Sequence, residues 1–400
     1  MSEQTASANH ARLHVIDSIR GLAVFGILLA NVWSWSGYKF IPFETIATLP
    51  LYSLDSLFLQ LHYFLVDGKF YAIFSMLFGA GFGLQLERKR DNEPAFIRIY
   101  RRRITFLLLF GLAHAFFWSG DILTLYALLA FVLVGLRGLS VEQSLWAAIL
   151  LLGFFLVPQL IAATTFAEVA THAKVAHKTY PDMTPDELRA AFALGGWPEV
   201  ITANVHNLYW RIVDYFPNGR ISRVLGFFML GFYLARSNYF VTGIYSGKRL
   251  LVFLLLGIGA TGWALAMDTN ITRWATSVSE VAMKAVLVLG QVCLALAYMS
   301  LLARVFRSPI GATATRPLAL IGRMAFTSYL MQTVIGITLF YGVGFGYWGT
   351  VGLAQLWLLA ALIFAFQVAS CALWFRYYHK GPVEWFWACL TAGQLSPNRK

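Results

Sequence analysis

Charged side chains are scarce in this sequence. Only 12% of the 400 residues are charged, whereas soluble proteins average about 25%. Hydrophobic residues make up 58%, and the mean hydropathy is +0.64. So few charges cannot cover a water-facing surface of this size, which excludes an ordinary soluble protein and indicates a chain embedded in a membrane.

Cysteine is also scarce, and several familiar motifs are missing. The three cysteines Cys293, Cys371 and Cys389 are odd in number and lack zinc-type spacing, so we expect neither a disulfide framework nor a metal site. No G-x-x-x-x-G-K-S/T loop occurs, which argues against ATP-driven transport by this chain. The polar residues 1–10 and the lack of a small-residue cleavage site argue against a cleavable signal peptide.

Acidic residues are fewer than basic ones, 19 against 31, and the net charge is +12. A basic balance can indicate nucleic acid as a partner, but here the basic residues lie in short loops between apolar segments. We interpret them as topology signals and phosphate contacts at the membrane face. The sequence therefore predicts membrane lipids, and no nucleic acid, as partners.

Apolar segments long enough to cross a bilayer are what the sequence has in abundance. A span needs about 20 mainly apolar residues, and each candidate is bounded by charges, glycine or proline. The pattern predicts an all-α polytopic membrane protein, a single transmembrane domain over residues 1–400, with ten spans. These are 17–36, 68–86, 104–119, 122–137, 144–164, 221–236, 249–267, 281–303, 318–342 and 351–375.

The distribution of lysine and arginine predicts the orientation. With ten spans, the basic loops at 88–103, 236–249 and 304–316 fall on the same side as both chain ends. Because cytoplasmic loops carry the excess of lysine and arginine, we expect both ends in the cytoplasm, with residues 376–400 as a cytoplasmic tail.

The longest segment outside the spans is 165–220, which we expect at the outer surface. Its two prolines and the acids after Thr184 predict a helix start there and short amphipathic helices lying on the membrane. Residues 51–66 are apolar but short, and should re-enter the membrane or lie at its interface. No internal repeat is visible, so the inverted repeats of many transporters find no support.

His114 and Asp121 form the sharpest polar pair. His114 lies near the outer end of a strongly apolar span, and Asp121 lies in a tight hairpin two helical turns later. A histidine in apolar surroundings can stay neutral and act as a base, with a carboxylate fixing its tautomer. The alternative is a buried histidine bonded to a backbone carbonyl, and the break at Gly120 leaves the contact open.

Other polar residues within spans have equally balanced alternatives. A polar side chain inside the membrane is costly, so it indicates either function or a bond to a neighbouring helix. Lys69 could instead reach the outer interface, and Arg20 could pair with Asp17. The remaining members of this set are Asn31 on the first span and Arg323, Ser328 and Gln332 on the ninth.

Five segments together resemble the YeiB-type family of bacterial membrane proteins, a family of unknown function. The first contains Arg20-Gly21-Leu22-Ala23 and ends at Asn31. The others are residues 68–79, His114 with 120–123, 322–329 and 381–385, in order along nearly the whole chain. The resemblance implies a multi-pass protein of the bacterial inner membrane.

That family looks related to the transmembrane acyltransferases, which include the type-three envelope O-acyltransferases and the lysosomal heparan-glucosaminide N-acetyltransferases. The envelope enzymes have a histidine ten residues after the glycine of the first helix, where Asn31 stands here. They have another where Gln332 stands. Neither amide can act as a base, so the resemblance implies that His114 does.

The leading hypothesis is therefore transfer of an acyl group from cytoplasmic acyl-CoA, with acetyl-CoA as the favoured donor, to an unknown extracytoplasmic acceptor. His114 would deprotonate the acceptor, Asp121 would orient the imidazole, and Lys69 would stabilise the thioester oxyanion. Asn31, Ser328 and Gln332 would line the path of the CoA arm. Cationic side chains would hold the CoA phosphates, namely Arg20, Arg101, Arg102, Arg103 and Arg323.

Two alternatives to an enzyme remain open. A transporter or flippase for a small metabolite, lipid or peptide could use the same polar line as a permeation path. The protein could also be a non-catalytic partner of another membrane protein. In either case the small-residue face at 255–260 could pack against a second copy, so a homodimer is expected.

Overall fold

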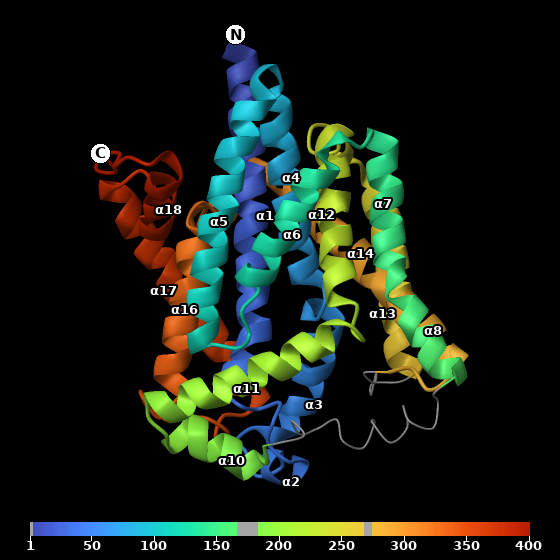
Figure 1. The fold of residues 1–400 in the computed structure, drawn as a ribbon, viewed down its shortest axis with the longest axis vertical. Helices are drawn as coiled ribbons and strands as arrows, with labels where there is room; N and C mark the ends of the chain where they lie inside the picture. The colour runs from blue at the N-terminus through green and yellow to red at the C-terminus, as the bar shows by residue number, and fades with distance from the viewer. Residues whose placement is uncertain (1–2, 166–182, 268–273) are drawn as a thin grey trace.

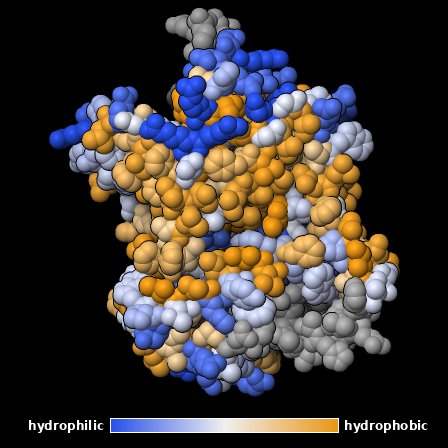
Figure 2. Space-filling model, viewed as in Figure 1, coloured by the Kyte–Doolittle hydropathy of each residue, from blue (hydrophilic) through white to orange (hydrophobic). Residues whose placement is uncertain are grey.

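The computed structural model describes residues 3–165, 183–267 and 274–400, with side chains from residue 14 onward. Over these ranges the chain forms helices and no strand, with one isolated bridge between Tyr378 and Arg399. The helices form an elongated bundle (Figure 1) with a broad apolar belt (Figure 2). The prediction of an all-α polytopic membrane protein is confirmed.

The centre of the bundle is built from α1 (Glu3–Trp35), α4 (Lys69–Arg88), α5 (Glu93–Phe117), α6 (Leu123–Gly135) and α12 (Arg220–Arg236). Glycines bring α4 and α12 into backbone contact. A Cβ at Gly79 would lie 1.9 Å from the carbonyl oxygen of Phe228, and one at Gly231 equally close to that of Met76. The glycine-rich stretch of α4 therefore serves helix packing.

Fewer helices than the expected ten are long and apolar enough to cross a membrane. In the described ranges, six stretches are long and apolar enough to cross a membrane, or seven if one bent pair counts as a single span. Each expected segment is mainly helical, but α6 has 13 residues and α12 has 17. α5 has arginines throughout its first half. The count of ten is thus not confirmed.

The expected span at 318–342 is not one straight helix. The structure has two helices there, α15 (Pro309–Arg323) and α16 (Ala325–Phe340), bent by 79° at Met324. The hydropathy pattern could not show this bend, because both arms are apolar. The backbone N–H groups of Phe326 and Thr327 both donate to Glu384 Oε1, at 2.8 and 3.0 Å. A distant carboxylate thus satisfies donors that the break leaves without helical partners.

The remaining helices flank this centre. One group comprises α7 (Val141–Phe154), α8 (Leu156–Thr165), α13 (Gly247–Met267) and α14 (Val278–Phe306). On another side α17 (Leu353–Tyr377) packs against α1, α3 and α15. In the run at 255–260, Gly257 faces α14, whereas Leu255, Leu256 and Ile258 are exposed. The homodimer stays a prediction.

One end of the bundle carries the amphipathic helices. α10 (Pro185–Arg189) and α11 (Trp197–Tyr215) lie across the lower end in Figure 1, near α2 (Phe43–Ile46). The predicted helix start at Thr184 is confirmed by a capping box with Glu187. Hydrogen bonds from Thr184 lower the pKa of the Glu187 carboxyl group, so the cap persists to more acidic pH. Residues 166–182 lie outside the described part.

The stretch at 51–66 also lies at this end. It folds as α3 (Tyr52–Leu61) and the π-helix η1 (His62–Val66), which lead into α4. We call this the distal end.

The opposite end is strongly basic. Figure 2 shows hydrophilic residues gathered above the apolar belt, where the N-terminal half of α5 and the loop before it lie. The tail at 376–400 folds here as α18 (Pro382–Ala392), which packs on α5 and α16. Trp387 Nε1 donates to the carbonyl of Arg103 at 2.9 Å, and Arg102 donates to that of Leu390. We call this the basic end.

Glu384 is expected to stabilise the break between α15 and α16. Glu384→Ala leaves two backbone donors without their acceptor, which costs about 1–3 kcal/mol for buried groups, so the thermal midpoint should fall. Thermal unfolding in detergent measures this. Glu87→Ala is the control, because the Glu87 pair with Arg236 is exposed and such pairs contribute little. Equal midpoints for both variants would contradict this role for Glu384.

Candidate functional site

The structure brings His114 and Asp121 into contact. His114 Nδ1 lies 2.8 Å from Asp121 Oδ1, with both side chains almost wholly buried. His114 Nε2 lies 3.0 Å from the hydroxyl oxygen of Thr333 on α16. The imidazole therefore bridges a carboxylate and a hydroxyl that are 212 residues apart in sequence, which follows from positions 121 and 333.

The order of these groups fixes the tautomer of the neutral imidazole. An ionised carboxylate can only accept a hydrogen bond, so Nδ1 carries the proton and donates a hydrogen bond to Asp121. Nε2 then has the free electron pair, and the Thr333 hydroxyl donates to it. A carboxylate, an imidazole and a hydroxyl in this order form the arrangement that activates hydroxyl groups in acyl transfer.

Asp121 is held by the turn that carries it. Its Oδ1 also accepts from the N–H of Leu123, and its Oδ2 accepts from that of Thr124 at 2.8 Å. Asp121 thus caps the first turn of α6 while it binds the histidine. The hairpin between α5 and α6 is short, so both helices fix the carboxylate relative to the ring.

α11 supports the same hairpin from the distal end. Asn204 donates to the carbonyl of Phe117 at 2.8 Å and accepts from the N–H of Ser119 at 3.2 Å. Arg211 donates to the carbonyl of Gly120 at 3.1 Å. The amphipathic helix therefore holds Phe117, Ser119 and Gly120, which lie just before Asp121.

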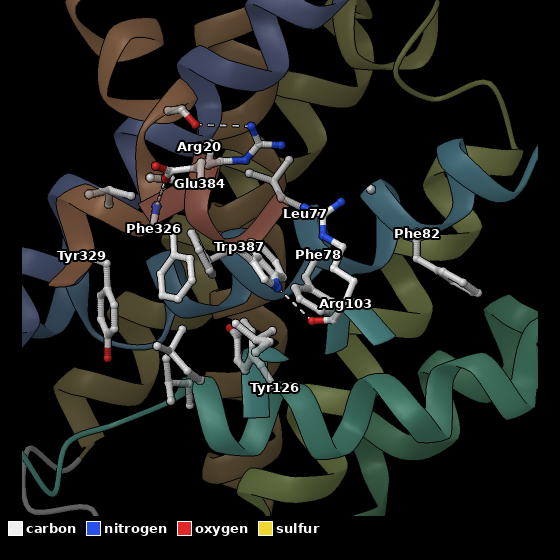
Figure 3. A pocket seen from close by; sticks show the side chains of 18 of the residues that line it. Arg20, Leu77, Phe78, Phe82, Arg103, Tyr126, Phe326, Tyr329, Glu384 and Trp387 are labelled. Carbon is white, nitrogen blue, oxygen red and sulfur yellow. Dashed lines mark hydrogen bonds between the residues drawn. The ribbon is translucent and has the colours of Figure 1, made fainter. Parts of the chain in front are cut away.

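A cavity of about 350 Å³ approaches this group from the basic end, and we call it the inner cavity. It lies among α1, α4, α5, α6, α16 and α18, and its walls are largely apolar. Arg20, Arg103 and Glu384 lie toward one end in Figure 3, with Tyr126 and Tyr329 toward the other. The Tyr329 ring centre is 5.3 Å from that of His114, so His114 lies directly behind the cavity wall.

A wider hollow of about 960 Å³ continues from the inner cavity to the basic end, and we call it the vestibule. The two hollows share Gln85, Tyr100, Arg103, Glu384 and Trp387. The described residues lining the vestibule include a single carboxylate, Glu384, and six cations. These cations are Arg88, Lys89, Arg98, Arg102, Arg103 and Lys380.

Four of the arginines expected to bind phosphate line these hollows. Arg102 lines the vestibule, Arg103 lines both hollows, and Arg20 and Arg323 line the inner cavity. Arg101 is exposed and lines neither. Arg20 forms an ion pair with Asp17 at 2.6 Å, which was the alternative to a functional role for Arg20.

The remaining expected site residues lie elsewhere. Lys69 is fully buried, donates to the carbonyl of Tyr63 at 2.6 Å and lines no described cavity. Asn31 lies half-buried on α1, also away from these hollows.

Ser328 and Gln332 face α17 rather than a cavity. Gln332 donates to Gln367 Oε1 at 3.0 Å, and Gln367 donates to the Ser328 carbonyl at 2.8 Å. These three residues form a link between helices, which was one of the two readings of that polar face.

Three residues at the site had no role in the interpretation of the sequence. Thr333 binds the histidine, Glu384 caps α16, and the buried Tyr329 hydroxyl makes no hydrogen bond within the described ranges. Tyr329 and Glu384 lie in segments that carried the family resemblance. Thr333 gave no signal, because threonine is ordinary in an apolar helix.

Removing the Thr333 hydroxyl should impair the histidine. Thr333→Val has nearly the same shape but leaves Nε2 without its donor, so we expect turnover to fall about tenfold or more, while Thr333→Ser keeps the hydroxyl and most of the activity. Acyl-transfer rates of the two variants measure this. Equal rates for valine and serine would exclude a role for the hydroxyl.

Comparisons with known proteins agree with the resemblance seen in the sequence. The family model "Protein of unknown function (DUF418)" matches residues 234–394. YxaH of Bacillus subtilis, described as uncharacterized, is 29% identical and covers 100% of this chain and 99% of its own. YeiB of Escherichia coli, also described as uncharacterized, is 28% identical over 96% of this chain and 97% of its own.

A third relative, an uncharacterized 39.9 kDa protein from Bacillus acidopullulyticus, is 26% identical over 96% of this chain and 95% of its own. No solved structure matches the chain. These three relatives each cover 96% or more of the chain. The comparisons confirm that the chain resembles the YeiB-type proteins over nearly its whole length.

Proposed function

We propose that this protein transfers an acyl group from cytoplasmic acyl-CoA to an acceptor on the other side of the bacterial inner membrane. The observation that carries the proposal is the pair of adjoining hollows, which share five lining residues and extend from the basic end to the wall in front of His114. Its wide, basic part and its narrow, apolar part match the two parts of acyl-CoA. The basic end would face the cytoplasm, as the loop charges predict.

The vestibule suits the nucleotide part of CoA. Six cations and one carboxylate leave a strong positive excess around a space large enough for a nucleotide. Arginine binds phosphate through paired, charge-assisted hydrogen bonds. Arg103 lies where the vestibule narrows, with its guanidinium 4.3 Å from the Trp387 ring, and would hold the phosphates next to the arm.

The inner cavity suits the acyl-pantetheine arm. Its walls include Phe78, Leu77 and Phe326, and it ends at Tyr126 and Tyr329. A thioester at that end would lie near the Tyr329 hydroxyl, which is buried and donates to no acceptor within the described ranges. This hydroxyl is better placed than Lys69 to donate to the oxygen that becomes negative during transfer.

The chemistry follows from the imidazole. The acceptor hydroxyl or amine gives its proton to His114 Nε2, directly or through the Thr333 hydroxyl, as its oxygen or nitrogen bonds to the acyl carbon. The carbon–sulfur bond then breaks, and the imidazolium returns the proton to the CoA thiolate. Asp121 holds the ring and stabilises its positive charge while the proton is on it.

Binding and transfer of labelled acetyl groups test the proposal. Purified protein in nanodiscs should be stabilised by CoA and acetyl-CoA, more weakly by dephospho-CoA, and not by pantetheine alone. With acetyl-CoA labelled in the acetyl group and a membrane extract as acceptor source, label should move to the extract as free CoA appears. No stabilisation by CoA and no label transfer would refute the proposal.

A transporter would use the same hollows differently. Proteoliposomes loaded with labelled acetyl-CoA distinguish the two, since an enzyme releases the acetyl group to an acceptor and keeps CoA inside. Passage of intact acetyl-CoA through the membrane would favour the transporter.

A further inference from the structure

A second polar hollow lies at the distal end, and we call it the distal pocket. It measures about 340 Å³ and is bordered by α11, the start of α12, the start of α4 and the hairpin between α5 and α6. Figure 2 shows polar residues interrupting the apolar belt above α11. Its charged lining residues are Lys39, Arg211, Arg220, Arg223, Asp67 and Asp214, so cations exceed carboxylates by four to two.

Two of these arginines have unused hydrogen-bond donors. The Arg220 guanidinium lies 4.5 Å from the ring centre of Tyr71 and has no hydrogen bond or ion pair among the described residues. Arg223 donates to Gln291 through Nη2, but its buried Nε has no partner in the described ranges. The buried Arg223 Nε is a costly donor without an acceptor, and the half-buried Arg220 guanidinium next to it is uncompensated by any described carboxylate bond, so this pair of arginines indicates a site for an anion.

The pocket also presents acceptor groups without partners. Asn207 is only 3% exposed, and its Oδ1 has no hydrogen bond within the described ranges. The Tyr71 hydroxyl, which can donate or accept, is likewise without one there. A carbonyl oxygen cannot bind an anion, so a ligand that satisfies the whole pocket must also carry a hydroxyl or amine donor.

From these atoms we infer that the distal pocket binds the acyl acceptor and that this acceptor is a hydroxylated or aminated anion. A phosphate or carboxylate group binds Arg220 and Arg223, while a hydroxyl or amine donates to Asn207. This inference rests on the proposed acyl transfer, and it adds the chemical class of the acceptor. A phosphorylated polyol fits it, either as a free molecule or as a lipid headgroup.

The distal pocket is separated from the inner cavity by a thin layer of side chains. Tyr126 lines the inner cavity, and its hydroxyl donates to the carbonyl of Tyr71, which lines the distal pocket, at 3.3 Å. Ser75 completes this layer, 2.5 Å from the Tyr126 hydroxyl. Arg211 at the pocket rim binds Gly120, the neighbour of Asp121. An acyl acceptor in the distal pocket would therefore be separated from the acyl group by this single layer. It would also lie next to the hairpin that carries Asp121.

Soluble probes test the site without CoA. In phosphatidylcholine nanodiscs, glycerol phosphate should raise the thermal midpoint, while glycerol and inorganic phosphate, which each carry half of the chemistry, should raise it less. Arg220→Gln should weaken glycerol phosphate about tenfold, the loss of one charge-assisted bond. Arg189→Gln is the matched control, because Arg189 is exposed at the same end but outside the pocket.

The outcomes separate this inference from the proposed function. Stabilisation by CoA in wild type and in Arg220→Gln, with no effect of glycerol phosphate, would overturn the acceptor class and leave acyl transfer standing. Equal effects of inorganic phosphate and glycerol phosphate, or an unchanged response of Arg220→Gln, would overturn it too. Glycerol phosphate binding without CoA binding would refute the enzyme and the role of the ligand as acyl acceptor, and would leave the distal pocket as an anion-binding site.

A further experiment, in which the lipid composition is varied, shows whether the ligand is a lipid headgroup or a free molecule. If a lipid headgroup occupies the pocket, nanodiscs that contain phosphatidylglycerol should suppress the response to glycerol phosphate. If they leave it intact, the ligand is a free molecule. Either result supports the site, provided that Arg220→Gln weakens the response.

Discussion

His114→Ala should lower the acyl-transfer rate by about 10²–10⁴-fold, the usual cost of removing a general base. In this variant Asp121 and Thr333 lose their common partner, and the Thr333 hydroxyl loses the base that it faces. CoA binding should be nearly unchanged, because the vestibule lies at the other end of the hollow. Rates with labelled acetyl-CoA, measured beside CoA-dependent thermal stabilisation, test both statements.

His379→Ala is the matched control for this variant. His379 is exposed at the basic end and lines none of the described hollows, so its substitution should change neither quantity. A stable His114→Ala protein with full turnover would remove His114 from the mechanism. A variant that loses turnover and stability together would instead assign His114 to packing.

Arg103→Met should weaken CoA binding about 10–100-fold. The change keeps an unbranched side chain beside Trp387 but removes the cation at the narrow point between vestibule and inner cavity. One charge-assisted bond contributes about 1.5–3 kcal/mol, and 1.4 kcal/mol corresponds to a factor of ten. Titration of CoA at low and high salt measures the loss and its dependence on ionic strength.

Arg101→Met provides the comparison on the same helix, two residues earlier. Arg101 is exposed and lines neither hollow, so its removal should leave CoA affinity within about twofold, as for an exposed charge. If both variants bind CoA equally, the vestibule is not the nucleotide site. The pair thus tests position, since charge and residue type are the same.

Residues close in sequence made part of the site predictable. His114 and Asp121 are seven residues apart, in a hairpin too short to separate them widely, and the structure confirms their contact. Thr333 lies 219 residues from His114, and its role depends on how α16 packs against α5. No local pattern records such packing, so the sequence could not indicate that residue.

The polar residues of α16 are visible in the sequence, but the sequence does not show what they contact. Ser328 and Gln332 signal a polar face, but only the position of Gln367 on α17 decides that this face meets a helix. The bend at Met324 was equally hidden, because it is stabilised by Glu384 from a later helix. Hydropathy predicts that a segment is apolar, and it does not show where the segment turns.

The bend at Met324 also has a consequence for the order of events during synthesis of the chain. Phe326 and Glu384 are 58 residues apart, so at about 5–20 residues per second the ribosome needs roughly 3–12 seconds to supply the missing acceptor. Until then the first N–H groups of α16 have no partner, and unsatisfied groups in hydrocarbon cost several kcal/mol each. α16 must therefore wait in contact with water or with the insertion machinery, and a pause in translation before Glu384 would prolong the interval in which this half of the protein can be degraded.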